Sequence, residues 1–271
     1  TDRAWQSVRM TSKRLVAVAV VAGALGAGSA VLATGGFRVD TDGGASIWCP
    51  GGMSRLSHVF DENASIFPGD PAPSIRIAAT IEADGFLVEE VTTGVHTGTH
   101  IDAPGHFILD GRTVDDLLAE ELVWPAYVID VRDRMTGTPA DGFQLGASDI
   151  RAYERLNGRI PAGAMVIIQT GFDQLYGTDA YLGDTPGFSG DAVQWMVDRR
   201  DIGGVGSDTF GPDATSDLDF GATFTILAND GVALPGLDNL DPLSIDGDLI
   251  IAVSQSGETK DAHRSRLRAP A

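Results

Sequence analysis

The chain has 271 residues, of which 43% are hydrophobic and 7% aromatic, so it can bury a core as one large domain or two small ones. Its formal net charge of −19 has the same sign as nucleic acids and anionic membranes, which argues against either as a main partner. Cys49 is the single cysteine, which excludes an internal disulfide and a thiolate metal cluster.

The N-terminal part has the pattern of a secretory signal peptide. Lys13 and Arg14 precede an apolar run over residues 15–33, which ends with Val31 and Ala33 at suitable cleavage positions. An uncleaved membrane anchor is the alternative, because the run is just long enough to span a bilayer. We expect residues 1–33 to be leader and signal peptide. This predicts a secreted or periplasmic protein that contacts a membrane only through an uncleaved leader.

The rest of the chain alternates between strand and helix patterns. Residues 34–47 are rich in Gly and Asp and are interpreted as a linker, and residues 48–271 as one domain. Strands are predicted from β-branched or continuously apolar stretches at residues 74–83, 86–95, 126–131, 164–170 and 249–253. Helices are predicted at residues 147–158, with Ser148 as N-cap and Gly158 at the end, and at residues 189–201, with Ser189 as N-cap. The class is therefore α/β or α+β.

The segment "HTGTHIDAPGHF", residues 96–107, holds three of the five histidines. A helix is disfavoured there by the "TGT" stretch and by Pro104. In a strand, His96, His100 and Asp102 share one face, but residues four apart are separated by about 13 Å. The backbone must therefore bend to bring both imidazoles to one ion, and we expect the bend at Gly98.

The same segment predicts a metal site with a histidine at its rim. Two imidazoles and a carboxylate, from His96, His100 and Asp102, suit one Zn²⁺ or Mn²⁺ ion and leave a position for water, whose pKa the ion lowers toward ~7. The turn after Asp102 returns His106 toward the cluster, where it can take or deliver a proton. The alternative is a polar loop whose histidines are satisfied by ordinary hydrogen bonds.

The pattern His-x-Gly-Thr-His-x-Asp-x-Pro-x-His-Phe resembles the signature of the cyclase/kynurenine-formamidase-like metal hydrolases. Flanking stretches, among them "SHVFDENASIFPGDP", "WPAYVIDV" and "GGVGSDT", follow in family order, so the resemblance covers residues 56–253. It implies a swivelling β/β/α single domain with a mixed sheet, usually a homo-oligomer (dimer or tetramer). It also implies that His96, His100 and Asp102 are metal ligands and that His106 is the catalytic acid/base. Phe67 resembles the family's aromatic residue near the substrate, with core packing as the alternative.

Two positions depart from the formamidase type, whose members hold a second zinc ion with a histidine and a glutamate. Thr223 stands at the histidine and Pro235 at the glutamate, and neither side chain replaces the lost ligand. This favours a single-metal site, as in isatin-hydrolase-like members. His263 lies in a polar, basic C-terminal segment and is expected to be solvated, and His58 is expected to be a structural residue.

The resulting hypothesis is a metal-dependent hydrolase of a C–N bond in a small molecule, similar to arylformamidase. Two alternatives stay open. One is an enzyme of the same chemistry acting on an isatin-type cyclic amide or a lactone. The other is a catalytically inactive, secreted metal- or ligand-binding protein, because the second pair of metal ligands is missing.

Overall fold

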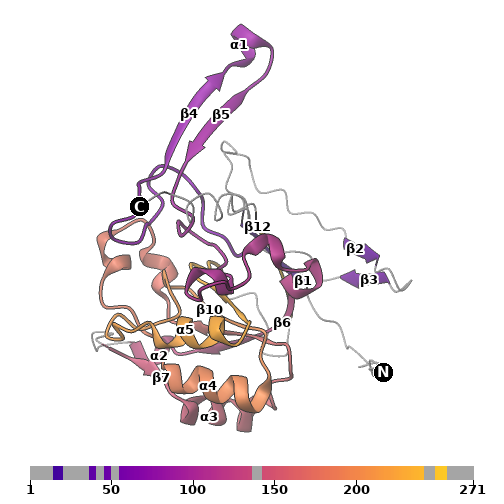
Figure 1. The fold of residues 1–271 in the computed structure, drawn as a ribbon, viewed down its shortest axis with the longest axis vertical. Coiled ribbons are helices and arrows are strands. Elements are labelled where there is room, and N and C mark those ends of the chain that lie inside the picture. Colours follow the sequence, from indigo (N-terminus) through magenta and orange to yellow (C-terminus); the bar gives the residue numbers. More distant parts are fainter. Residues whose placement is uncertain are drawn as a thin grey trace.

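The computed structural model describes residues 15–20, 37–40, 46–49, 55–135, 142–240 and 248–254. A mixed sheet of six strands forms its centre, in the order β1-β12-β6-β8-β10-β11 (Figure 1). In that order the strands are Leu15–Val20, Asp248–Ser254, Val123–Asp130, Met165–Gln169, Gly204–Ser207 and Val232–Leu234. β12 and β6 run antiparallel, whereas all other neighbours are parallel. The predicted single α/β domain with a mixed sheet is confirmed.

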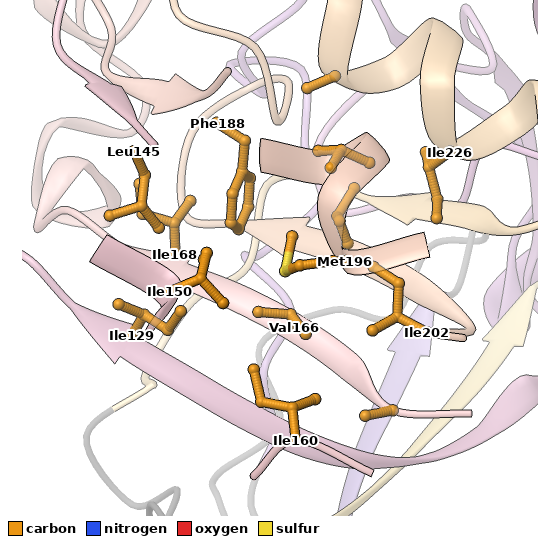
Figure 2. Packing of buried hydrophobic residues seen from close by; sticks show 14 of the residues in the cluster. Ile129, Leu145, Ile150, Ile160, Val166, Ile168, Phe188, Met196, Ile202 and Ile226 are labelled. Carbon is orange, nitrogen blue, oxygen red and sulfur yellow. The ribbon is translucent and has the colours of Figure 1, made fainter. Parts of the chain in front are cut away.

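Helices α3 (Ala147–Asn157), α4 (Gly190–Arg200) and α5 (Gly221–Ala228) cover one face of this sheet (Figure 1). Strand β8 is buried on both faces and sends alternate side chains to either side. Val166 and Ile168 pack under the helices, together with Phe188, Met196 and Ile226 (Figure 2). The continuously apolar sequence of β8 therefore reflects its central position between two cores.

A second core lies on the opposite face of the sheet. It is formed by Leu56, Ile101, Trp124, Ala126, Val128, Met165, Ile167, Val232, Leu234, Leu237 and Leu240. Ile101 is important here because it lies between two of the predicted metal ligands. Its burial ties their backbone to the core of the domain.

The predicted helix boundaries are correct except at the start of α3. Ser189 caps α4 as expected, with its hydroxyl accepting from the backbone N–H of Ala192 at 3.1 Å. The N-cap of α3 is Gly146, not Ser148. The carboxylate of Asp149 accepts from the Gly146 N–H at 2.9 Å and so fixes the start of the helix before Ser148 is reached.

One predicted strand is interrupted. Residues 74–83 form β4 (Ser74–Ala79) followed by a single helical turn, α1 (Ile81–Asp84), and the chain returns as β5 (Val88–Thr92). The Thr80 hydroxyl accepts from Ala83 N–H at 3.2 Å, and Gly85 ends the turn at φ 80°, a left-handed conformation that suits glycine. The expectation of one strand over residues 74–83 is therefore wrong after Ala79.

The remaining described elements are short. They are the strands β2 (Phe37–Asp40), β3 (Ser46–Cys49), β7 (Gln144–Leu145) and β9 (Gly187–Phe188), and the helical turn α2 (Arg132–Met135). β1 falls within the apolar run interpreted as a signal peptide, and β2 lies in the segment interpreted as a linker; both interpretations stay predictions. Among the described residues, no helix has the length and apolar character needed to cross a membrane.

The contact of β9 with the segment before α5 yields a stability prediction. A Cβ on Gly187 would overlap the backbone of Asp213 and Ala214, which cannot move without displacing α5. We expect Gly187→Ala to lower the free energy of unfolding by about 3 kcal/mol. In the control, Gly211→Ala, the new methyl meets nothing within 4 Å, and the change should stay within about 0.5 kcal/mol. Urea denaturation followed by circular dichroism measures both, and equal midpoints for the two variants would refute the packing argument.

Candidate metal centre and active site

The backbone of the predicted metal segment is fixed along the outer edge of β11. Asp102 N–H donates to Ala233 C=O at 2.9 Å, and Ala233 N–H returns a bond to Asp102 C=O at 3.1 Å. His100 N–H donates to Pro235 C=O at 3.4 Å. These bonds anchor two of the predicted ligands to the edge of the six-stranded sheet.

The chain bends sharply between the two histidines, as expected. Gly98 has φ +66°, in the left-handed region that glycine adopts without strain. Its N–H donates to Ser65 C=O at 3.3 Å, and a Cβ there would come within 3.1 Å of the Tyr176 hydroxyl. In a straight strand, the Cα atoms of residues four apart are separated by ~13 Å. The bend brings the two side chains together, so that His96 Nδ1 lies 3.2 Å from His100 Nε2.

Three side-chain atoms form a nearly equilateral triangle. His96 Nδ1 lies 3.2 Å from His100 Nε2 and 2.8 Å from Asp102 Oδ1, and His100 Nε2 lies 3.4 Å from Asp102 Oδ1. Ligand atoms ~2.1 Å from an ion are about 3.4 Å apart in tetrahedral and about 3.0 Å apart in octahedral geometry. The spacing therefore fits three ligands of one divalent ion, and it accommodates either geometry.

The orientation of the groups also fits a metal ion. His100 Nδ1 lies 2.9 Å from Gly98 C=O, to which it donates, so Nε2 presents its lone pair to the triangle. Asp102 Oδ1 is buried without a correctly oriented hydrogen-bond donor among the described residues, although both imidazole nitrogens are close. Burial would raise the pKa of Asp102, but the imidazoles of His100 and His96 outweigh it and hold that pKa well below its usual range. The carboxyl group is thus ionised, as a ligand must be.

His106 returns to the rim of the triangle on a single 3₁₀ turn, Pro104–His106. Its ring centroid lies 4.0 Å from that of His96, and ligand atoms of His96, Asp102 and His106 all lie within 4.8 Å of one another. His106 is exposed, whereas Asp102 is buried. His96, Asp102 and His106 line a hollow that opens to solvent, together with Val95, Ile101, Ala103 and Val114. The structure thus brings the three predicted metal ligands and the predicted acid/base, His106, together.

An aromatic cluster of Phe67, Phe107, Phe210 and Phe220 continues from His106. The Phe107 ring packs edge-to-face against the His106 ring, with centroids 4.7 Å apart, and against the Phe220 ring, with centroids 5.8 Å apart. Phe67 meets Phe220 at 6.4 Å and Phe210 at 5.9 Å, and it remains 39% exposed. Phe67 therefore belongs to a surface near the site and is not buried in the core.

The two positions that depart from the formamidase type have structural roles. Thr223 donates its hydroxyl to the buried Asp213 carboxylate, which also accepts from the N–H groups of Ala222 at 2.7 Å and Thr223 at 3.1 Å. This carboxylate caps the N-terminus of α5. Pro235 supplies the carbonyl that accepts from His100 N–H. In the described part of the chain, no second group of potential ligands is found, and His263 lies outside it.

The bend at Gly98 is supported by a pair of stacked rings that the local sequence does not reveal. The His58 ring stacks on Tyr176 with centroids 3.7 Å apart, and His58 N–H donates to Thr99 Oγ1 at 3.0 Å. Burial lowers the pKa of His58 and raises that of Tyr176 to about 12, so both rings are neutral near pH 7. His58 is structural, as expected. Tyr176 gave no local sequence signal, because it is distant in the chain from the histidine motif.

Gly98 provides a direct test of the bend. We expect Gly98→Ala to weaken divalent-metal binding by 10-fold or more, because the methyl strains the backbone and displaces Tyr176 or the carbonyl that orients His100. Gly85→Ala is the matched control: Gly85 has φ +80° but lies at the hairpin tip with nothing within 4 Å of the added methyl. Competition with a chelating dye measures both affinities. Equal affinity in the two variants would show that the bend does not control the site.

A second prediction concerns Asp208, which follows β10. Its buried carboxylate accepts from Thr170 Oγ1 at 2.6 Å and from the N–H groups of Thr170 and Gly171 at 2.8 and 2.7 Å, yet burial raises its pKa to about 6. The folded state thus holds this proton more tightly than the unfolded state. The associated stability is fully present below pH ~4 and is lost as pH rises through ~6.

We expect this loss to amount to about 2 kcal/mol between pH 4 and 7.5, and Asp208→Asn should abolish it. Urea denaturation gives the free energy of unfolding of wild type and variant at both pH values. The effect of Asp208 is the change between the two pH values in wild type minus the same change in the variant. If the free energy of unfolding depends on pH in the same way in both proteins, the pKa of Asp208 is not raised in the folded state.

The comparisons with known proteins agree with this geometry. The family model described as "Putative cyclase" matches residues 54–214, more than half of the chain. The isatin hydrolase of Roseibium aggregatum is 31% identical over 222 residues, covering 75% of this chain and 83% of the relative. The kynurenine formamidase of Bacillus cytotoxicus is 42% identical, but over 28% of this chain and 37% of the relative.

The fold agrees as well. Isatin hydrolase A from Labrenzia aggregata, solved with benzyl benzoate, superimposes with a TM-score of 0.68 at 27% identity and covers 75% of this chain and 87% of that structure. The match of the family model, the length of the isatin hydrolase alignment and the common fold lead to one conclusion: the chain belongs to the cyclase family.

Proposed function

We propose that the protein is a metal-dependent hydrolase of a non-peptide C–N bond in a small aryl substrate. The observation that carries this proposal is the triangle of His96 Nδ1, His100 Nε2 and Asp102 Oδ1, whose edges of 2.8–3.4 Å suit the ligands of one ion. The relatives that match this chain, an isatin hydrolase and a kynurenine formamidase, are named for such hydrolyses.

His96, His100 and Asp102 would hold the ion, and three protein ligands leave a position for water. When bound, a divalent ion supplies a water of lowered pKa and polarises the substrate carbonyl. The donor set of two imidazoles and one carboxylate suits Zn²⁺ and Mn²⁺, and we propose that a single ion of one of these two is used. Thr223 and Pro235, which occupy the positions of a second ligand pair, are engaged with Asp213 and His100 instead.

The remaining residues have separate tasks in hydrolysis. Water adds to the carbonyl carbon, the C–N bond breaks, and the leaving nitrogen gains a proton. His106 is exposed at the rim and carries that proton between the attacking water and the leaving nitrogen. The aromatic cluster, beginning at Phe107 and ending at the half-exposed Phe67, offers ring faces and edges to an aryl group.

Between the two substrate types, a cyclic amide of the isatin type is favoured over an acyclic formamide. The sequence alignment with the isatin hydrolase covers 75% of this chain, whereas the alignment with the kynurenine formamidase covers 28%. Thr223 and Pro235, which stand where formamidases have ligands of a second zinc ion, bond to Asp213 and His100 instead. This departure from the formamidase type supports the same choice. We also propose that the protein acts after export, because the apolar run at residues 15–33 has the composition of a signal peptide.

Two substitutions separate metal binding from proton transfer. His100→Ala should lose bound metal and activity together, because it removes one corner of the triangle. His106→Gln should retain the metal but lower kcat by 10²- to 10⁴-fold, since the glutamine cannot exchange the proton. Metal content is measured by mass spectrometry, and turnover is assayed on isatin, N-formylkynurenine and a simple lactone.

Full activity and full metal content in His100→Ala would contradict the proposal. If the wild-type protein binds metal but turns over none of the three substrates, the hydrolase assignment is wrong and a metal- or ligand-binding protein is the better description.

A further inference from the structure

The loop that carries His106, residues 104–112, is closed by a backbone hydrogen bond between its two ends. Gly105 N–H, in the turn that carries His106, donates to Arg112 C=O at 2.8 Å. A Cβ on Gly105 would lie 3.1 Å from the same carbonyl oxygen, so the two ends of the loop are in close contact. The position of Arg112 therefore determines the position of the turn that carries His106.

The Arg112 side chain extends from this point to two carboxylates. Its Nε donates to Asp230 Oδ1 at 2.8 Å, and its Nη1 donates to both carboxylate oxygens of Glu121 at 3.0 Å. Its Nη2 donates to the Asp230 backbone carbonyl at 3.4 Å. A guanidinium group is planar and its donors have fixed directions, so bonds to two separate partners set its orientation as well as its position.

Both partners of Arg112 are attached to the central sheet. Glu121 lies in the 3₁₀ turn Ala119–Leu122, which ends where β6 begins, and its carboxylate also accepts from Leu118 N–H at 2.8 Å. Asp230 lies two residues before β11, and its N–H donates to Leu227 C=O of α5 at 3.2 Å. β6 and β11 run in the same direction, so both partners lie at the N-terminal edge of the sheet.

β11 and the turn before it hold both parts of the candidate site. Within the strand, Ala233 exchanges two backbone hydrogen bonds with Asp102, and in the preceding turn Asp230 binds Arg112. The distance between the metal triangle and His106 thus depends on how the loop is held at Arg112. A proton carrier must stay within hydrogen-bond reach of the group that it serves, and a displacement of about 1 Å can lower the rate about 100-fold.

We propose that Arg112 is a positioning residue, which sets the place of His106 relative to the metal triangle by holding the loop on the sheet. The proposal rests on the proposed function, in which His106 carries the proton. The side chains of Arg112, Glu121 and Asp230 are 30%, 39% and 67% exposed, and ion pairs as exposed as these contribute little to stability. The three residues, called here the Arg112 clamp, are therefore expected to affect position more than folding.

Steady-state kinetics of the metal-loaded protein tests the effect on the reaction. Arg112→Ala should lower kcat by 10- to 100-fold and leave KM and metal content at the wild-type values, because the triangle and the aromatic cluster are unchanged. Arg112→Lys should restore only part of kcat, since one ammonium group does not reproduce the two-sided geometry. Arg134→Ala is the matched control: Arg134 forms an exposed ion pair of 2.9 Å with Asp149, away from the loop, and kcat should stay unchanged.

Hydrogen–deuterium exchange tests the position of the loop without reference to catalysis. In Arg112→Ala, backbone amides of residues 104–112 should exchange at least 10-fold faster than in wild type, because the closing bond from Gly105 is weakened. The amide of Asp102, which pairs with β11, should keep its exchange rate. A purely structural role would instead increase exchange throughout the domain and lower the urea midpoint. Arg134→Ala should match wild type in both regions.

Three results would overturn the proposal: unchanged exchange of residues 104–112 in Arg112→Ala, faster exchange throughout the domain, or a wild-type kcat in this variant. Loss of bound metal together with kcat would also contradict it, by showing that Arg112 supports the triangle and not His106. A wild-type protein that hydrolyses none of the three substrates would refute the proposed function instead. The exchange rates alone then decide whether Arg112 holds the loop.

Discussion

The hydrogen-bonded pairing of residues 100–102 with the end of β11 is the constraint on which the site depends. It holds His100 and Asp102 at the edge of the sheet, while Ile101 between them is buried in the second core. Against this fixed pair, the left-handed Gly98 turns the chain so that His96 reaches the same point. The position of three potential ligands thus follows from one backbone bend and one short antiparallel bridge.

The surroundings of the triangle are consistent with the proposed single ion and aromatic substrate. Where a second pair of ligands would be needed, Thr223 completes the cap of α5 through Asp213, and Pro235 contributes its carbonyl to the bridge. Pro235 therefore supports the backbone that presents the first site, whereas Thr223 fixes the start of α5. On the open side, His106 is followed by Phe107 and Phe220, so the proposed proton transfer and the proposed recognition of an aryl group would occur on adjacent surfaces.

The sequence predicted most reliably what is encoded locally. His96, His100, Asp102 and His106 lie within 11 residues, and Gly98 marks the only position where the bend could be made without strain. The buried strand β8 and the Ser189 cap of α4 were predicted for the same reason. The N-cap of α3 was misplaced because Asp149 reaches back to Gly146, a choice between two nearby caps that depends on side-chain geometry.

Features assembled from distant segments gave no such signal. Tyr176 contacts Gly98 although the two residues are 78 positions apart in the chain. Phe220 reaches the aromatic cluster from a left-handed backbone conformation, which a phenylalanine in the sequence does not predict. The hairpin sequence predicted two strands, but its projection from the domain emerges only in three dimensions (Figure 1). The sequence therefore predicted the chemistry of the site better than its surroundings.

The most direct test of the central claim is anomalous diffraction from crystals soaked with Zn²⁺ or Mn²⁺, recorded at the absorption edge of the metal. The account predicts one strong peak about 2.1 Å from His96 Nδ1, His100 Nε2 and Asp102 Oδ1. A second strong peak near Thr223, or the absence of any peak at the triangle in metal-saturated protein that is active, would contradict it.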